Sequence, residues 1–165
     1  MNNETITIKT IVDENFQDYK YASMFLAMPK CDFKCFKELG RSIEECQNFS
    51  SLNSPNINVY IKDIFRRYTG NTITKSLIFG GLEPILSFNE LLNCINYFRE
   101  NGCLDDIVIY TGYYENEIED KIFKLRKFPN IVMKFGRFIP GSKSKLDSIL
   151  EVTLASDNQY AKKIS

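Results

Sequence analysis

Three cysteines within sixteen residues are the side chains best suited to chemistry in this chain. Cys31, Cys35 and Cys46 have the spacing C-x3-C-x10-C, and charged residues are frequent between them. Thiolates are good ligands for soft metals, and three from one loop can hold three corners of a four-iron cluster while the fourth iron stays open. We therefore expect residues 31–46, the cysteine segment, to bind a metal or a cluster.

Zinc is the alternative occupant of such a segment. A structural zinc site usually has four Cys or His ligands, and the chain contains no histidine. The fourth ligand would then be Cys94, Cys103 or a carboxylate such as Asp32 or Glu38. Zinc therefore stays open as the second interpretation.

The other two cysteines are not expected in the site. Cys94 lies beside the apolar stripe of a helical pattern, and a free cysteine behaves as a small hydrophobe, so we expect it in the core. Cys103 lies in a connector and fits either role. The lack of histidine also excludes Ser-His and Cys-His nucleophile pairs, histidine acid/base chemistry and histidine-ligated metals. Any chemistry must then use Cys, Asp, Glu, Lys, Tyr or a cofactor, and we assign no catalytic residue.

The charge of the chain does not indicate a binding partner. Lys and Arg together number 21, Asp and Glu together number 21, and no long run of one sign occurs, so neither nucleic acid nor an acidic membrane is expected to bind. The N-terminus has no signal-peptide pattern, and no apolar stretch is long enough to span a bilayer. We expect a cytoplasmic protein whose thiols are reduced.

Strand and helix patterns alternate along the chain, which predicts parallel strands joined by right-handed crossovers, hence one α/β domain over residues 1–165. Ser87 and Glu90 form an S-x-x-E pattern that predicts a capping box, and Gly102 is the expected helix stop. The patterns predict strands at 21–27, 76–79, 107–110, 131–135 and 152–155, and helices at 59–68, 88–100 and 115–127.

Chemistry-bearing residues follow three of these strands. The cysteine segment follows the first strand, Gly80 to Pro84 follow the second, and Thr111 with Gly112 follows the third. Ligands of such sheets bind beyond the carboxyl ends of the strands, so we expect all three segments on one rim. Taken alone, Gly80 and Gly81 also fit an ordinary tight turn with an exposed Glu83.

Taken together, these motifs resemble the radical S-adenosylmethionine superfamily, specifically the activating proteins of anaerobic ribonucleoside-triphosphate reductase. The match follows five segments in order. They are Cys31-x3-Cys35 with Phe36, Gly80-Gly81-Leu82-Glu83-Pro84, Tyr110-Thr111-Gly112-Tyr113, Phe135-Gly136-Arg137-Phe138-Ile139 and Ala155-Ser156-Asp157-Asn158-Gln159. The third cysteine of the superfamily would fall at position 38, which is Glu38 here, so Cys46 is the natural substitute.

The resemblance implies a partial (β/α) barrel of parallel strands that binds a 4Fe-4S cluster and S-adenosylmethionine. It implies Cys31, Cys35 and Cys46 as cluster ligands and Phe36 beside the adenine. Around the methionine moiety it implies Gly80, Gly81 and Glu83, with Thr111 on the same rim, while Asn158 and Gln159 meet ligand or partner.

The implied activity is cleavage of S-adenosylmethionine to a 5'-deoxyadenosyl radical, which generates a glycyl radical on anaerobic ribonucleoside-triphosphate reductase. An electron donor such as flavodoxin would reduce the cluster. Two alternatives stay open. One is a radical enzyme acting on another glycyl-radical protein or on a small molecule, and the other is a non-catalytic zinc or redox-sensing module.

Overall fold

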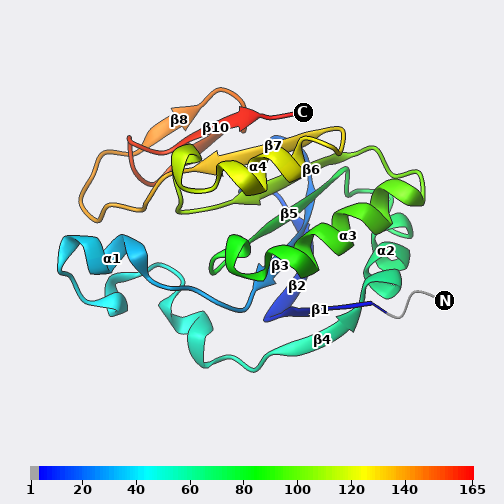
Figure 1. Cartoon of the computed structure of the whole chain (residues 1–165), viewed down its shortest axis with the longest axis horizontal. Helices are drawn as coiled ribbons and strands as arrows, with labels where there is room; N and C mark the ends of the chain where they lie inside the picture. The colour runs from blue at the N-terminus through cyan, green and yellow to red at the C-terminus, as the bar shows by residue number, and fades with distance from the viewer. Residues whose placement is uncertain (1–3) are drawn as a thin grey trace.

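A six-stranded mixed sheet forms the centre of the computed structural model, which describes residues 4–165 (Figure 1). The four inner strands are mutually parallel, and the two outer strands are antiparallel to their neighbours. The predicted α/β class is confirmed. In spatial order the strands are β10 (Tyr160–Lys163), β7 (Ile131–Phe135), β6 (Asp106–Tyr110), β5 (Ser76–Gly81), β3 (Ser23–Met28) and β2 (Thr10–Asn15).

The sequence analysis expects only parallel strands, and it does not predict the two outer, antiparallel strands. A short connection suffices between antiparallel neighbours, whereas parallel neighbours need a long crossover. Residues 16–22 are enough to join β2 to β3. Strands β2 and β10 do not pair with each other in the described part of the chain, so the sheet is not a closed barrel.

Three helices cover one face of this sheet (Figure 1). They are α2 (Ile61–Thr69), α3 (Phe88–Glu100) and α4 (Glu119–Leu125), close to the three predicted helices. Alternate strand residues such as Phe79, Ile109 and Met133 are fully buried against the apolar sides of these helices. Alternation of side chains along each strand therefore sends one set of apolar residues to the helices and the other set to the opposite face.

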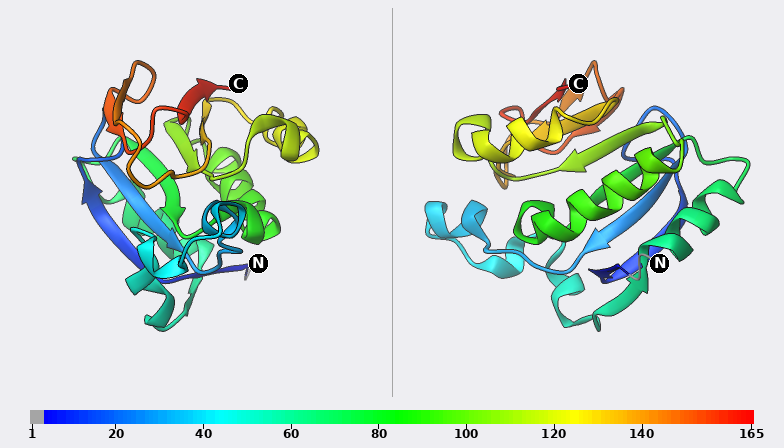
Figure 2. Two further views of the ribbon diagram at one scale, coloured as in Figure 1. Left: turned by 90° about the vertical axis from the view of Figure 1, so that its left-hand side faces the viewer. Right: turned by 45° about the vertical axis from the view of Figure 1, so that its right-hand side comes forward.

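A hairpin covers part of the opposite face (Figure 2). Its strands are β8 (Lys145–Asp147) and β9 (Val152–Leu154), and its Leu150 and Leu154 pack in one cluster with Ile78, Val108 and Val132 of the sheet. The strand predicted at 152–155 exists as β9, but it pairs with β8 and not with the sheet.

Several short elements have no counterpart in the sequence prediction. Strands β1 (Thr5–Ile8) and β4 (Ile57–Tyr60) form a separate two-stranded sheet. The cysteine segment contains helix α1 (Lys34–Leu39). Strands β2, β8 and β10 were not predicted either, and neither were the 3₁₀ helices η1 (Ile43–Glu45), η2 (Phe49–Asn53) and η3 (Pro84–Ser87). The 3₁₀ helix η4 (Glu115–Glu117) lies within the helix predicted at 115–127.

The predicted capping box at α3 is wrong. The 3₁₀ helix η3 runs directly into α3, so Ser87 does not have the extended backbone of an N-cap, and its buried hydroxyl makes no hydrogen bond within residues 4–165. Glu90 is engaged elsewhere, because its Oε2 accepts a hydrogen bond of 2.6 Å from the backbone N–H of Thr7 in β1. Gly102 does follow the helix with φ of 81°, as expected for a stop.

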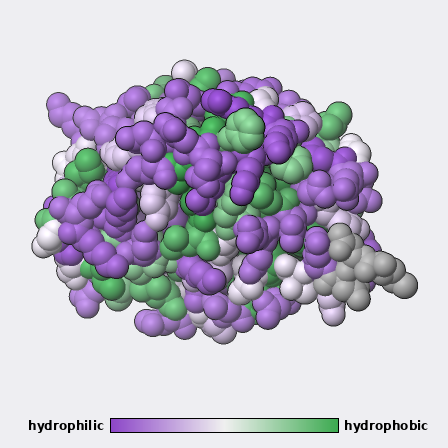
Figure 3. Space-filling model, viewed as in Figure 1, coloured by the Kyte–Doolittle hydropathy of each residue, from purple (hydrophilic) through white to green (hydrophobic). Residues whose placement is uncertain are grey.

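Hydrophilic side chains cover most of the face that carries the three helices (Figure 3). Among the described residues, no helix combines the length and apolar character that a membrane span requires. The domain predicted over residues 1–165 includes residues 1–3, which lie outside the described part.

The close approach of Gly80 to Phe25 gives a test of the fold. A Cβ at position 80 would lie 2.7 Å from Phe25 Cζ, so Gly80→Ala should lower the free energy of unfolding by about 1–3 kcal/mol through overpacking. Denaturant unfolding measures this loss. In a Phe25→Leu background the same substitution should cost less, and an equal cost in both backgrounds would contradict the packing explanation.

Candidate metal centre

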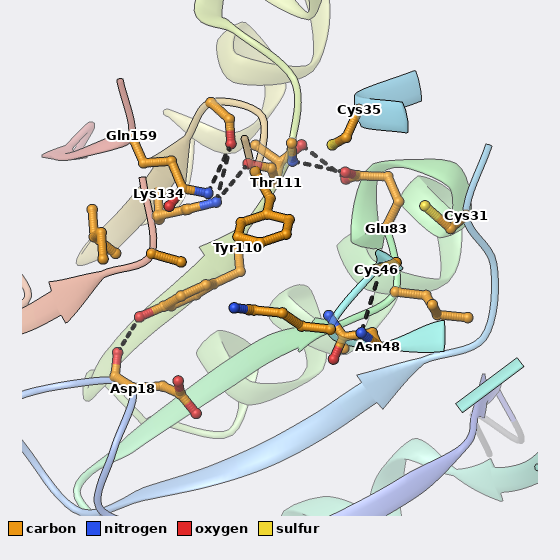
Figure 4. A pocket seen from close by; sticks show the side chains of 18 of the residues that line it. Asp18, Cys31, Cys35, Cys46, Asn48, Glu83, Tyr110, Thr111, Lys134 and Gln159 are labelled. Carbon is orange, nitrogen blue, oxygen red and sulfur yellow. Dashed lines mark hydrogen bonds between the residues drawn. The ribbon is translucent and has the colours of Figure 1, made fainter. Parts of the chain in front are cut away.

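The carboxyl ends of the inner strands surround one cavity of about 330 Å³ (Figure 4). Cys31 and Cys35 follow β3, Glu83 follows β5, and Thr111 with Gly112 follows β6, and all five residues line this cavity. The prediction that the three segments meet on one rim is confirmed.

Local backbone geometry turns the cysteine segment toward the cavity. Phe33 has a left-handed conformation with φ of 54°, and helix α1 begins directly after it, so Cys31 and Cys35 stand on either side of a sharp turn. The backbone N–H of Phe33 donates to Cys31 Sγ over 3.3 Å. Phe36 in α1 is buried, lines the cavity and packs against Phe138 with ring centroids 6.1 Å apart.

Cys46 reaches the same cavity from a different segment. It follows the 3₁₀ helix η1, and its Sγ accepts a hydrogen bond of 3.4 Å from the backbone N–H of Asn48. Cys46 and Asn48 both line the cavity. Figure 4 shows Cys31, Cys35 and Cys46 on the same side of the cavity as Glu83. The structure therefore brings the three predicted ligands to one cavity.

The three thiols that line the cavity fit a cluster. No group of three Cys, Asp or Glu side chains in residues 4–165 is arranged to hold one metal ion. A cluster takes each thiolate on a different iron, so its ligands need not converge on one point. Burial raises the pKa of Cys31 to about 12 and also raises that of Cys35. A bound metal cation reverses this effect and deprotonates a coordinating thiol, so the residues present fit such a group.

Glu83 joins the three segments of the rim. Its backbone N–H donates to the carbonyl of Lys30, next to Cys31, over 2.6 Å. Its Oε1 accepts from Thr111 Oγ1 at 2.8 Å, and its Oε2 accepts from the Gly112 N–H at 2.9 Å. Glu83 is 6% exposed, so the interpretation of an exposed glutamate in a simple turn is wrong. Burial raises its pKa, while these donors and the charge of Lys134 act in the opposite direction.

Arg137 holds helix α1 against the rim. Its Nε and Nη2 donate to the two carboxylate oxygens of Glu38 at 2.7 and 2.9 Å, and the same guanidinium bonds Glu117 at 2.5 and 2.6 Å. Glu38 is therefore committed to Arg137 and does not line the cavity. Asp32 is the other carboxylate considered as a zinc ligand. It accepts a hydrogen bond from the Tyr113 hydroxyl.

The remaining predicted site residues separate into two groups. Gly81 and Gln159 line the cavity, whereas Gly80 and Asn158 do not, and Gly80 instead makes room for the Phe25 ring. Cys94 is fully buried in the core under the helices, as predicted, and Cys103 packs at the edge of that core.

Lys134 is a cavity residue that the sequence analysis missed. It lines the cavity from β7, is 8% exposed, and its Nζ donates to the carbonyls of Gly136 at 3.1 Å and Thr111 at 3.4 Å. Burial lowers its pKa to about 8. A lone charge within the otherwise apolar strand IVMKF was the available signal, because strands covered on both faces rarely contain lysine.

A comparison with protein families identifies the domain. The family described as a 4Fe-4S single cluster domain matches residues 22–159, which include the rim, the cysteine segment and the four parallel strands β3, β5, β6 and β7. The chain belongs to this family. It is thus an iron–sulfur protein with a 4Fe-4S single cluster domain, and the predicted iron–sulfur cofactor is confirmed at that level. No curated protein matches the chain.

Substitution of single cysteines tests the ligand assignment within this 4Fe-4S single cluster domain. Cys46→Ala should reduce iron and sulfide in anaerobically reconstituted protein to a small fraction of the wild-type content, because one corner of the cluster loses its thiolate. Cys94→Ala is the matched control, since Cys94 is buried in the core and should leave the content unchanged. Full iron and sulfide content in Cys46→Ala would show that another residue is the third ligand.

The Arg137 ion pairs predict a pH dependence of stability. Arg137 holds the pKa of Glu117 well below its ordinary value of 4.5, so this stabilisation is complete above about pH 4.5 and is lost as the pH falls further. Arg137→Met should cost about 2 kcal/mol, less than the roughly 3–5 kcal/mol of a fully buried pair because Glu38 is half exposed.

Denaturant unfolding at pH 7 and pH 3.5 measures both effects. The wild type should lose more stability than Arg137→Met between these two pH values. The exposed pair Arg41 and Glu45 gives the control, because Arg41→Met should change stability little at either pH. Equal losses in wild type and Arg137→Met would contradict the role of this pair.

Proposed function

We propose that this iron–sulfur protein is a radical S-adenosylmethionine activase. It would cleave S-adenosylmethionine and generate a glycyl radical on anaerobic ribonucleoside-triphosphate reductase. The observation that carries the proposal is that the three cysteines share one cavity with Gly81, Glu83 and Thr111, which belong to the motifs resembling that superfamily. We also propose that the curved mixed sheet corresponds to the partial (β/α) barrel of the superfamily.

The residues have distinct roles in this proposal. Cys31, Cys35 and Cys46 would hold a 4Fe-4S cluster, and three protein ligands would leave its fourth iron for the substrate. When bound, the cluster would supply the electron that cleaves the sulfonium to methionine and a 5'-deoxyadenosyl radical. The protein itself binds, orients and shields the substrate.

Two parts of the cavity suit S-adenosylmethionine. Glu83 Oε2 has one hydrogen bond in the described structure, from Gly112, and so retains a lone pair that can accept from the ammonium group of the methionine moiety. The buried aromatic ring of Phe36 provides an apolar surface that suits the adenine. Gly81 and Thr111 provide backbone and hydroxyl groups on the rim between them.

The partners follow from the same proposal. Because a glycyl radical forms on a protein backbone, the substrate in this proposal is a protein. We propose the reductase as that substrate, an electron donor such as flavodoxin, and the cytoplasm as the location. Activation of a different glycyl-radical protein is the alternative within the same chemistry.

Anaerobically purified and reconstituted protein tests the function. Iron and sulfide analysis with an absorption spectrum should give about four irons per chain. Addition of dithionite and S-adenosylmethionine should then release 5'-deoxyadenosine and methionine in equal amounts. The same reaction without dithionite is the control and should release neither.

Three outcomes separate this proposal from its alternatives. A glycyl radical signal on added reductase, detected by electron paramagnetic resonance, would identify the partner. Release of 5'-deoxyadenosine without any radical on the reductase would support the cleavage of S-adenosylmethionine but reject the reductase as the partner. A colourless protein that contains zinc and releases no 5'-deoxyadenosine would reject the activase and favour the zinc or redox-sensing module.

A further inference from the structure

A small void of about 20 Å³ adjoins the cavity and brings a buried cation next to the cysteine segment. Cys31, Cys35 and Arg137 all line this void. The side chain of Arg137 is 7% exposed, so water screens its charge little. A nearly unscreened positive charge therefore lies beside two of the three thiols that are proposed to hold the cluster.

Gly112 connects the guanidinium to one of these thiols. Arg137 Nη1 donates a hydrogen bond of 2.9 Å to the carbonyl of Gly112. A Cβ placed on Gly112 would lie 3.3 Å from Cys35 Sγ. Gly112 thus adjoins both side chains, and the space between the cation and the thiol is the width of one residue without a side chain.

The carboxylates that pair with Arg137 are more distant from the thiols. Glu38 and Glu117 line neither the cavity nor the void. Their side chains are 47% and 22% exposed, so water screens them more than it screens Arg137. At the thiols, the positive charge of the network therefore acts more strongly than its negative charges.

The other groups around the void make this cation important. The carboxylates of Asp32 and Glu83 line the void, and cysteines bind a cluster as thiolates. Lys34 also lines it, but its side chain is 38% exposed and is paired with Glu117 at 2.5 Å. Reduction of a cluster adds an electron to this negative surrounding, and the local net charge is one of the quantities that set the reduction potential.

We infer that Arg137 raises the reduction potential of the 4Fe-4S cluster, in addition to its support of α1. The inference rests on the cluster of this domain and on its proposed ligands. It does not depend on cleavage of S-adenosylmethionine, so a protein that holds a cluster but releases no 5'-deoxyadenosine would reject the proposed function alone.

A potentiometric titration of reconstituted protein, without S-adenosylmethionine, tests the inference. Electron paramagnetic resonance measures the reduced cluster at each potential. In Arg137→Met the ratio of reduced to oxidised cluster at the wild-type midpoint should fall roughly tenfold, which is about 59 mV for a one-electron couple. Arg137→Lys keeps the charge and should stay near the wild-type midpoint.

Glu117→Gln separates charge from support of the fold. It removes a negative charge and keeps a hydrogen-bond acceptor, so it should raise the potential, whereas a loss of support alone would not. If Arg137→Met takes up no cluster, Glu117→Gln decides the matter. Arg67→Met is the matched control, because Arg67 forms a similar two-bond pair with Asp13 but lines neither the cavity nor the void.

Two results would overturn the inference. One is an equal midpoint in wild type and Arg137→Met, and the other is a potential in Glu117→Gln that is unchanged or lower. A wild type that takes up no cluster at all would reject the ligand assignment and the inference with it.

Discussion

The buried carboxylate of Glu83 is the interaction on which the rim of this protein depends. One residue bonds the backbone beside Cys31, the hydroxyl of Thr111 and the backbone N–H of Gly112, so the ends of β3, β5 and β6 are tied together through it. Parallel strands bring these ends to one edge but do not fix their loops. Glu83 supplies that fixation, with Lys134 compensating part of its charge.

A second set of interactions, the ion pairs of Arg137, holds the cysteine segment in place. Arg137 connects Glu38 of α1 to Glu117 near α4, and it thereby holds the helix that carries Cys35 over the cavity. Among residues 4–165, the contacts that hold the segment of Cys46 are short 3₁₀ turns and exposed ion pairs such as Arg41 with Glu45. Two of the three proposed ligands thus lie on a fixed support, and the third lies on a longer loop of the chain.

The sequence predicted the elements whose patterns are local and strong. The inner strands, α2 and α3 were found near their observed positions because apolar periodicity is set by burial on one face. The meeting of the three segments at one edge of the sheet was predicted from the parallel order of the strands. The engagement of Glu38 with Arg137 and of Glu90 with Thr7 could not be found, because each joins residues that are distant in the chain and chosen by tertiary geometry. The charge of Lys134 within an apolar strand could be noticed from the sequence. The direction of its side chain could not, because it depends on which face of the strand meets the cavity.

The central claim is that Cys31, Cys35 and Cys46 hold one cluster and leave one iron for S-adenosylmethionine. Mössbauer spectroscopy of protein reconstituted with iron-57, recorded with and without S-adenosylmethionine, tests it most directly. The account predicts that one of the four irons of the 4Fe-4S cluster changes its signal on addition while the other three do not. A cluster whose four irons all keep their signals when S-adenosylmethionine is added in excess would contradict it.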